Sequence, residues 1–135
     1  MPFTILVIDD DEPFLEIVGE VLGRAGYTVL TAASGQDGLA RARADHPDLI
    51  LVDYHMPGMT GLMVVQQLQA AEATQRIPVV SLTAGTAEQA NELSRAGCIG
   101  FIPKPFVAEE FLRLVAEILN ATTGRNRRGE SRRGT

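Results

Sequence analysis

Five short apolar runs recur along the chain at regular intervals. Their first residues lie 21 to 28 residues apart, which leaves room for one helix between each run and the next. Three of the runs consist almost entirely of Ile, Leu and Val, a pattern typical of parallel strands that are covered on both faces. The five predicted strands are Thr4–Ile8, Tyr27–Leu30, Leu49–Val52, Ile77–Leu82 and Cys98–Ile102.

The segments between these runs carry apolar residues at helical spacing. Asp11 is a suitable N-cap for a first helix with Pro13 in its first turn, and Gly26 ends that helix. Ser34 and Thr86 are suitable N-caps for the second and fourth helices. The third and fifth helices are marked by Val64, Val65, Leu68 and Ala71, and by Phe111, Leu114, Val115 and Ile118. This alternation predicts an α/β fold of the (βα)₅ type, a doubly wound parallel sheet of five strands.

Length and composition indicate one domain followed by a tail. The 135 residues are enough for one core, and 45% apolar with 21% charged residues is typical of globular proteins. We predict a folded domain over residues 1–120 and an Arg-rich disordered tail or linker over residues 121–135, where no apolar residue follows Ala121. The apolar runs are too short to span a bilayer, no signal peptide is visible, and Cys98 is the only cysteine. We therefore expect a cytoplasmic protein without membrane contact.

The charges are unevenly distributed along the chain. Residues 1–120 contain 16 acidic and 7 basic residues, whereas residues 121–135 contain five arginines and one glutamate. An acidic domain is a poor general binder of nucleic acid, and an arginine tail without aromatic residues carries no specificity, so we predict no specific nucleic-acid partner. Lys104 is the only lysine among 12 basic residues, which indicates that a compact point charge is required at this position.

The candidate chemistry lies at the carboxyl ends of the predicted strands. The first strand is followed by Asp9 and Asp10, the third by Asp53, the fourth by Thr83 and the fifth by Lys104. Binding sites of open parallel sheets form beyond these ends. If the first and third strands are neighbours, the three carboxylates converge on one pocket, with the hydroxyl and the ammonium group at its rim.

Such a pocket favours phosphoryl transfer to a carboxylate. Several carboxylates close together resist full ionisation unless a cation neutralises them, and oxygen ligands in a half-open site suit Mg²⁺, with Mn²⁺ as an alternative. A carboxylate beside the cation can act as a nucleophile toward phosphorus, while the metal and Lys104 offset the charge of the phosphoryl oxygens. The predicted product is an aspartyl phosphate that accepts a hydrogen bond from Thr83.

Five motifs, in order and at appropriate spacing, carry a family resemblance. They are Ile5–Asp11, Asp53, Met56–Gly61, Ser81–Ala84 and Lys104–Phe106. With them, the chain resembles the receiver domain of bacterial two-component response regulators over about residues 3–120. The resemblance implies a flavodoxin-like receiver fold with strand order 2-1-3-4-5, which places the first and third strands side by side.

The resemblance also implies the metal ligands and the phosphoacceptor. Asp53 would be the phosphoacceptor and a metal ligand. Asp10 would bind Mg²⁺ directly, and Asp9 mainly through water. The backbone carbonyl of His55 would complete the protein ligands. The side chain of His55 is either a partial gate on water access to the phosphate or an exposed loop residue.

The remaining implied roles concern the response to phosphorylation. Thr83 would be the switch hydroxyl, and Lys104 the partner of the phosphate. Phe101 would be the switch aromatic that turns inward when the threonine moves toward the phosphate. It is also a residue type that commonly belongs to a core. The peptide bond before Pro105 would be cis.

Together these features predict a signalling switch rather than an enzyme, catalysing only its own phosphotransfer and dephosphorylation. A sensor histidine kinase or histidine phosphotransfer protein would phosphorylate Asp53 in a Mg²⁺-dependent reaction, and the resemblance implies that it docks on the Phe14–Leu22 helix. Phosphorylation would then shift the equilibrium of a protein-interaction face around Ala87–Ala96 and Phe101, which binds a downstream protein target. The expected state is a monomer or a phosphorylation-dependent homodimer.

Three other functions fit the sequence less well. A phosphate-independent adaptor with the same fold is disfavoured by the complete set of site residues. An aspartyl-nucleophile hydrolase similar to the haloacid dehalogenases needs a second Asp two residues after the first, and His55 occupies that position. Flavin binding is disfavoured because no phosphate loop rich in Gly and Ser or Thr follows the first strand.

Overall fold

Five parallel strands form one sheet in the order β2-β1-β3-β4-β5, which confirms the predicted fold. The computed structural model describes residues 2–82 and 86–134, with side chains as far as Thr122. The strands are β1 (Thr4–Ile8), β2 (Thr28–Ala32), β3 (Leu49–Asp53), β4 (Val79–Leu82) and β5 (Gly100–Ile102). The helices are α1 (Glu12–Arg24), α2 (Gly35–Asp45), α3 (Gly61–Ala70), α4 (Ala87–Ala96) and α5 (Ala108–Gly134).

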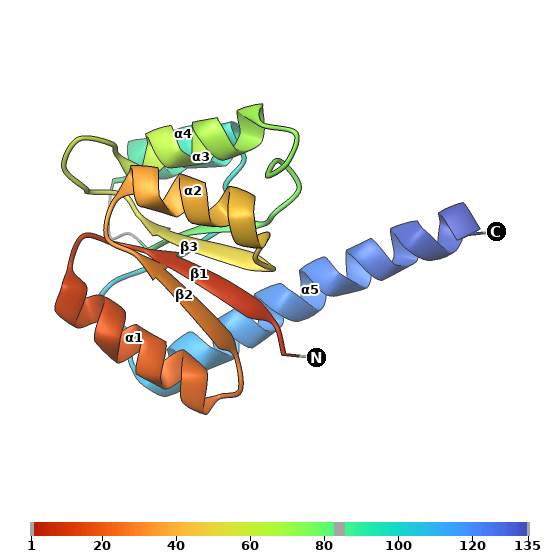
Figure 1. Ribbon diagram of the computed structural model, residues 1–135, viewed down its shortest axis with the longest axis horizontal. Helices are drawn as coiled ribbons and strands as arrows, with labels where there is room; N and C mark the ends of the chain where they lie inside the picture. Colours follow the sequence, from red (N-terminus) through yellow and green to blue (C-terminus); the bar gives the residue numbers. More distant parts are fainter. Residues whose placement is uncertain (1, 83–85, 135) are drawn as a thin grey trace.

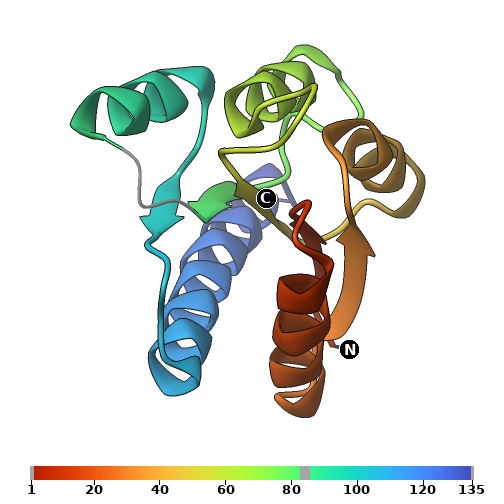
Figure 2. The ribbon, with the colours of Figure 1, turned by 90° about the vertical axis from the view of Figure 1, so that its left-hand side faces the viewer.

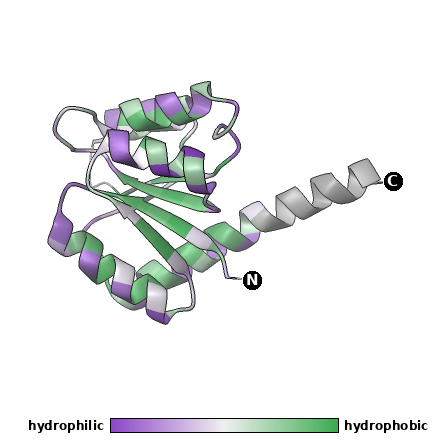
Figure 3. Cartoon of the chain, viewed as in Figure 1, coloured by the Kyte–Doolittle hydropathy of each residue, from purple (hydrophilic) through white to green (hydrophobic). Residues whose placement is uncertain are grey.

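Helices cover both faces of the sheet. Helices α1 and α5 lie on one face and α2, α3 and α4 on the other (Figures 1 and 2). Successive residues of β1 alternate between two separate cores: Ile5 and Val7 pack with α1 and α5, whereas Leu6 and Ile8 pack with the other three helices. This double burial explains why β1 and β3 are almost continuously apolar rather than alternating, as the green colour along these strands in Figure 3 shows.

The register of the sheet brings the strand ends to one edge. Ile8 of β1 pairs with Val52 of β3, so Asp9 and Asp53 follow at adjacent positions. Asp53 in turn pairs with Leu82 of β4. Figure 2 shows the molecule from this edge, with the strands ending toward the viewer. The edge is therefore the place where polar side chains from different strands meet.

The predicted helix caps are present. The side chain of Asp11 accepts a hydrogen bond of 3.2 Å from the backbone N–H of Phe14. Ser34 caps α2 and Thr86 caps α4 in the same way. These caps satisfy backbone donors that the first helical turn leaves unpaired, and they fix where each helix leaves the sheet edge.

Two strands are shorter than the apolar pattern suggests. Strand β4 begins at Val79 rather than at Ile77, and β5 begins at Gly100 rather than at Cys98. Pro78 has no backbone N–H to donate to a neighbouring strand, which limits β4 at its start. The pattern of apolar residues does not show where the hydrogen bonding between strands begins.

Helix α5 is longer than the sequence suggests. It runs from Ala108 to Gly134, through the segment 121–134 that composition indicates to be a disordered tail or linker. No proline interrupts this segment, and Arg and Glu are good helix formers, so the backbone can continue in helical conformation. Although α5 has 27 residues, no helix in the described part of the chain is long and apolar enough to cross a membrane.

Gly61, the first residue of α3, lies against the backbone that follows β3. Its N–H donates a hydrogen bond of 2.8 Å to the carbonyl oxygen of Tyr54. A Cβ atom at this position would lie 2.8 Å from the Cα atom of Tyr54 and against the carbonyl oxygen of Asp53. Both neighbours are backbone atoms, so a side chain here would have to displace the end of β3 itself.

We therefore expect Gly61→Ala to lower the free energy of unfolding by about 1–3 kcal/mol, the usual effect of forcing an extra methyl group into a closed space. Gly23→Ala is the matched control, because a Cβ atom at Gly23 in α1 would meet nothing within 4 Å. It should raise stability by about 0.5–1 kcal/mol through the better helix propensity of alanine. Urea unfolding measures both. Equal unfolding midpoints for Gly61→Ala and the wild type would contradict the close contact.

Candidate functional site

Three carboxylates converge at the carboxyl edge of the sheet, as the sequence predicts. One oxygen from each of Asp9, Asp10 and Asp53 lies within 4.8 Å of the others. Asp9 is buried at 1% exposure, Asp53 is half-buried and Asp10 is exposed. Asp9 also accepts a hydrogen bond of 3.0 Å from the backbone N–H of Asp11, which orients its carboxylate. The site is therefore closed toward the sheet and open at Asp10.

Lys104 joins two of these carboxylates. It follows β5, and its Nζ lies 2.8 Å from Oδ2 of Asp9 and 3.6 Å from Oδ1 of Asp53. Burial alone would lower the pKa of Lys104, but the hydrogen bond to Asp9 and the charges of Asp9 and Asp53 outweigh it and raise this pKa above its ordinary value. Lys104 is thus protonated at neutral pH and partly neutralises the acidic group.

The acidic group nevertheless disfavours its own full ionisation. The pKa of Asp53 is raised, first by burial and next by the negative charge of Asp9, and Lys104 only partly reverses this effect. Three carboxylates face one ammonium group, so negative charge is left uncompensated when all of them are ionised. A bound cation would remove this imbalance.

The donor set fits a hard divalent cation. Its three side chains offer carboxylate oxygens, and the group is open at the exposed Asp10, so that a bound ion can keep several water molecules. These are the properties that suit Mg²⁺, and Mn²⁺ accepts the same ligands. The acidic pocket is therefore a candidate Mg²⁺ site formed by Asp9, Asp10 and Asp53.

The structure also describes the other residues singled out from the sequence, except Thr83. His55 is exposed in the loop after β3, and its ring makes an edge contact with the ring of Tyr54, with a centroid distance of 4.9 Å. Phe101 in β5 is 37% exposed. The peptide bond between Lys104 and Pro105 is cis. Thr83 lies outside the described residues.

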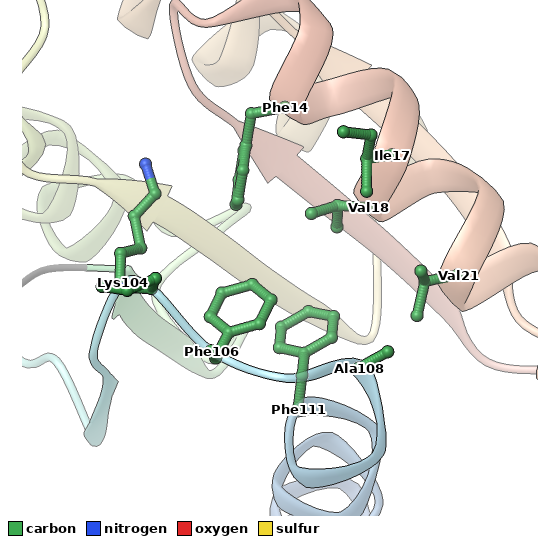
Figure 4. Close-up of a pocket in the computed structure, with 9 residues that line it drawn as sticks. Phe14, Ile17, Val18, Val21, Lys104, Phe106, Ala108 and Phe111 are labelled. Carbon is green, nitrogen blue, oxygen red and sulfur yellow. The ribbon is translucent and has the colours of Figure 1, made fainter.

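Phe14 is a contact of the site that the sequence pattern does not reveal. In the sequence it is one of the apolar positions of the first helix. In the structure Nζ of Lys104 lies over its ring, 4.2 Å from the ring centroid. Phe14 also borders an apolar pocket of about 520 Å³ between α1 and the start of α5 (Figure 4). Helical spacing predicts which side of a helix is apolar. It does not predict that the ring of Phe14 will contact Lys104, which lies far away in the sequence.

This fold and site define a class: doubly wound α/β proteins with an acidic pocket and one lysine at the carboxyl edge of the sheet. The family described as "Response regulator receiver domain" matches residues 5–116. The chain belongs to this family of phosphoacceptor switches of two-component signalling. The family resemblance seen in the sequence is thereby confirmed.

Curated relatives and solved structures agree with this assignment. The chain is 36% identical over 133 residues to the response regulator MprA of Mycolicibacterium vanbaalenii, and the match covers 97% of this chain but only 56% of MprA. It is 30% identical to the polar-differentiation response regulator DivK of Brucella ovis, over 88% of this chain and 98% of DivK. The structure of the chemotaxis protein CheY4 of Vibrio cholerae superposes with a TM-score of 0.83 at 32% identity, covering 87% of this chain and 98% of CheY4.

The repulsion among Asp9, Asp10 and Asp53 is expected to lower the thermal stability of the protein when no cation is bound. Because the fold raises the pKa of Asp53, the folded protein binds a proton there more tightly than the unfolded chain does, and the ionised form of Asp53 destabilises the fold relative to the protonated form. Asp53→Asn should therefore raise Tm in EDTA at pH 7, and Mg²⁺ should raise the Tm of this variant less than that of the wild type. Thermal unfolding with EDTA and with Mg²⁺ measures both effects.

Asp45→Asn is the matched control, because Asp45 is exposed and lies 4.0 Å from its partner Arg41. Such a pair contributes little, so this variant should unfold like the wild type in both solutions. A lower Tm for Asp53→Asn than for Asp45→Asn in EDTA would show that the carboxylates do not repel one another as described.

Proposed function

We propose that this receiver domain accepts a phosphoryl group on Asp53 and thereby switches a protein-interaction face. The donor would be a phosphohistidine of a sensor histidine kinase or histidine phosphotransfer protein. The observation that supports this proposal best is the convergence of Asp9, Asp10 and Asp53 with the ammonium group of Lys104 at one edge of the sheet. The domain would occupy residues 1–120, with 121–135 as tail or linker.

In the proposed reaction an oxygen of Asp53 attacks phosphorus. The new O–P bond forms as the bond from phosphorus to the donor nitrogen breaks, and the imidazole leaves with the bonding electron pair. Lys104 offsets the charge of the phosphoryl oxygens. A Mg²⁺ ion held by Asp9, Asp10, Asp53 and the backbone carbonyl of His55 would supply further positive charge. Hydrolysis of the aspartyl phosphate returns the free carboxylate, so the domain acts on itself alone.

The proposed switch involves the side of the sheet edge that leads to α4. The hydroxyl of Thr83 would donate a hydrogen bond to the phosphoryl group. Phe101, 37% exposed in the described state, would turn inward as Thr83 moves. Phosphorylation would shift the population of two arrangements of the α4, β5 and α5 face, and a downstream protein would bind one of them. A homodimer formed on phosphorylation would use the same face.

The donor protein is proposed to dock on α1 and the start of α5. Ile17 and Val107, large apolar residues, are 62% and 64% exposed there. Ile17 lines the apolar pocket that Phe14 and Phe106 border, and Val107 directly follows Phe106 in the chain. Lys104 also lines this pocket, and its Nζ lies 3.6 Å from Oδ1 of Asp53 (Figure 4). A phosphohistidine presented at this surface would have a short path to the acceptor. We place this exchange in the cytoplasm, where the free thiol of Cys98 stays reduced.

Intact mass after incubation with acetyl phosphate tests the proposal. In Mg²⁺ the wild type should gain the mass of one phosphoryl group. The gain should be absent in EDTA, because the ionised site then lacks its cation, and absent in Asp53→Asn, because the nucleophile is removed. Asp45→Asn, which removes an exposed carboxylate far from the site, should be phosphorylated like the wild type.

A folded wild type that gains no mass from acetyl phosphate or from a phosphorylated histidine phosphotransfer protein would contradict the proposal. The phosphate-independent adaptor would then be the better description. A gain that persists in Asp53→Asn would place the phosphoryl group on another residue.

A further inference from the structure

We propose that Phe14 is a positioning residue that holds the ammonium group of Lys104 at the acidic pocket. This inference rests on the proposed function, in which Lys104 meets the phosphoryl group. The ring of Phe14 would keep the lysine beside Asp53 throughout the reaction, including the stage at which its contacts to carboxylates are exchanged.

Three contacts around Nζ of Lys104 support the proposed role of Phe14. Nζ lies 2.8 Å from Oδ2 of Asp9, 3.6 Å from Oδ1 of Asp53 and 4.2 Å from the ring centroid of Phe14. The face of an aromatic ring carries negative potential and attracts a cation within about 6 Å. The ammonium group thus has three attractive neighbours, one directly after β1, one in β3 and one in α1, and the side chain of Lys104 is only 27% exposed.

The ring of Phe14 is itself held in place. Its backbone N–H donates to the N-cap Asp11, which fixes the start of α1. The edge of the ring meets Phe106, with a centroid distance of 6.0 Å, and Phe106 stacks on Phe111 at 4.4 Å with an interplanar angle of 9°. Phe111 is fully buried in the core. This row of three rings, visible in Figure 4, connects the ammonium contact to the fixed core of the domain.

The contact to Phe14 differs in kind from the contacts to the two carboxylates. Asp9 and Asp53 are proposed to bind a cation, and Asp53 also to be the acceptor, so both would change partners during phosphoryl transfer. A ring has no lone pair to give to a metal and does not compete for it. When Lys104 exchanges a carboxylate for a phosphoryl oxygen, the ring is the neighbour that stays. It limits the conformations of a long and flexible side chain.

The sole lysine of the chain makes the contact directly observable. With ¹³Cε-labelled lysine, the spectrum of the full chain contains signals from Lys104 alone. Because the ammonium end lies over the ring face, the Hε protons should be shifted upfield by the ring current in the wild type. Phe14→Leu, which keeps an apolar side chain, should remove this shift. Phe14→Tyr, which keeps the ring, should retain it.

The kinetic test uses acetyl phosphate, because this small donor needs no docking surface. In Mg²⁺ the second-order rate constant for phosphorylation should fall about fivefold in Phe14→Leu, the size expected for loss of one partly desolvated cation–π contact. Phe14→Tyr should restore the rate. Phe3→Leu is the control, because it makes the same substitution at another half-buried phenylalanine of the same core. Its rate should equal that of the wild type.

An unshifted Lys104 signal in the wild type, or an equal shift in Phe14→Leu, would overturn the inference. So would equal rates for Phe14→Leu and the wild type. A wild type that is not phosphorylated at all would contradict the proposed function instead. The Lys104 spectrum, recorded without any phosphodonor, would still decide whether Phe14 holds the lysine.

Discussion

Mutual repulsion of three carboxylates is the constraint from which the rest of this site follows. Asp9, Asp10 and Asp53 present oxygens within 4.8 Å of one another, and Asp9 has almost no access to solvent. A pocket of this kind is stable only with positive charge beside it. Lys104 supplies part of that charge. The remaining negative charge favours a divalent cation, and the proposed phosphoryl transfer needs positive charge at the same place.

The fold creates this constraint through the order of its strands. Because β1 lies between β2 and β3, the chain crosses from one helical layer to the other, and the ends of β1 and β3 become neighbours. The apolar residues of two inner strands, Ile5–Ile8 of β1 and Leu49–Val52 of β3, are buried on both faces. Charged residues therefore collect at the edge, where Asp9 and Asp53 immediately follow buried apolar positions. The same double burial that stabilises the sheet concentrates the chemistry at one end.

The sequence predicts well what depends on neighbouring residues. The positions of the strands and the caps at Asp11 and Ser34 follow from apolar spacing and from local hydrogen bonding. The strand order is implied by the family resemblance and not by the spacing. Contacts between distant segments are not encoded in this way. The meeting of Phe14 with Lys104 depends on how α1 and the segment after β5 approach each other across the sheet edge. Composition also does not predict how far α5 extends, because it measures the lack of apolar residues to bury and not whether the backbone is helical.

The basic residue at the acidic pocket is a lysine rather than an arginine, and the two side chains would behave differently there. An arginine in place of Lys104 could grip one carboxylate with two parallel hydrogen bonds, because its guanidinium group matches a carboxylate in shape. These two hydrogen bonds would stabilise the ion pair with Asp9 relative to a contact with a phosphoryl oxygen. The ammonium group is a point charge with rotatable donors, so it can exchange a carboxylate oxygen for a phosphoryl oxygen without a change in geometry. In a chain whose other 11 basic residues are all arginine, lysine stands where the proposed chemistry requires a cation that can change partners.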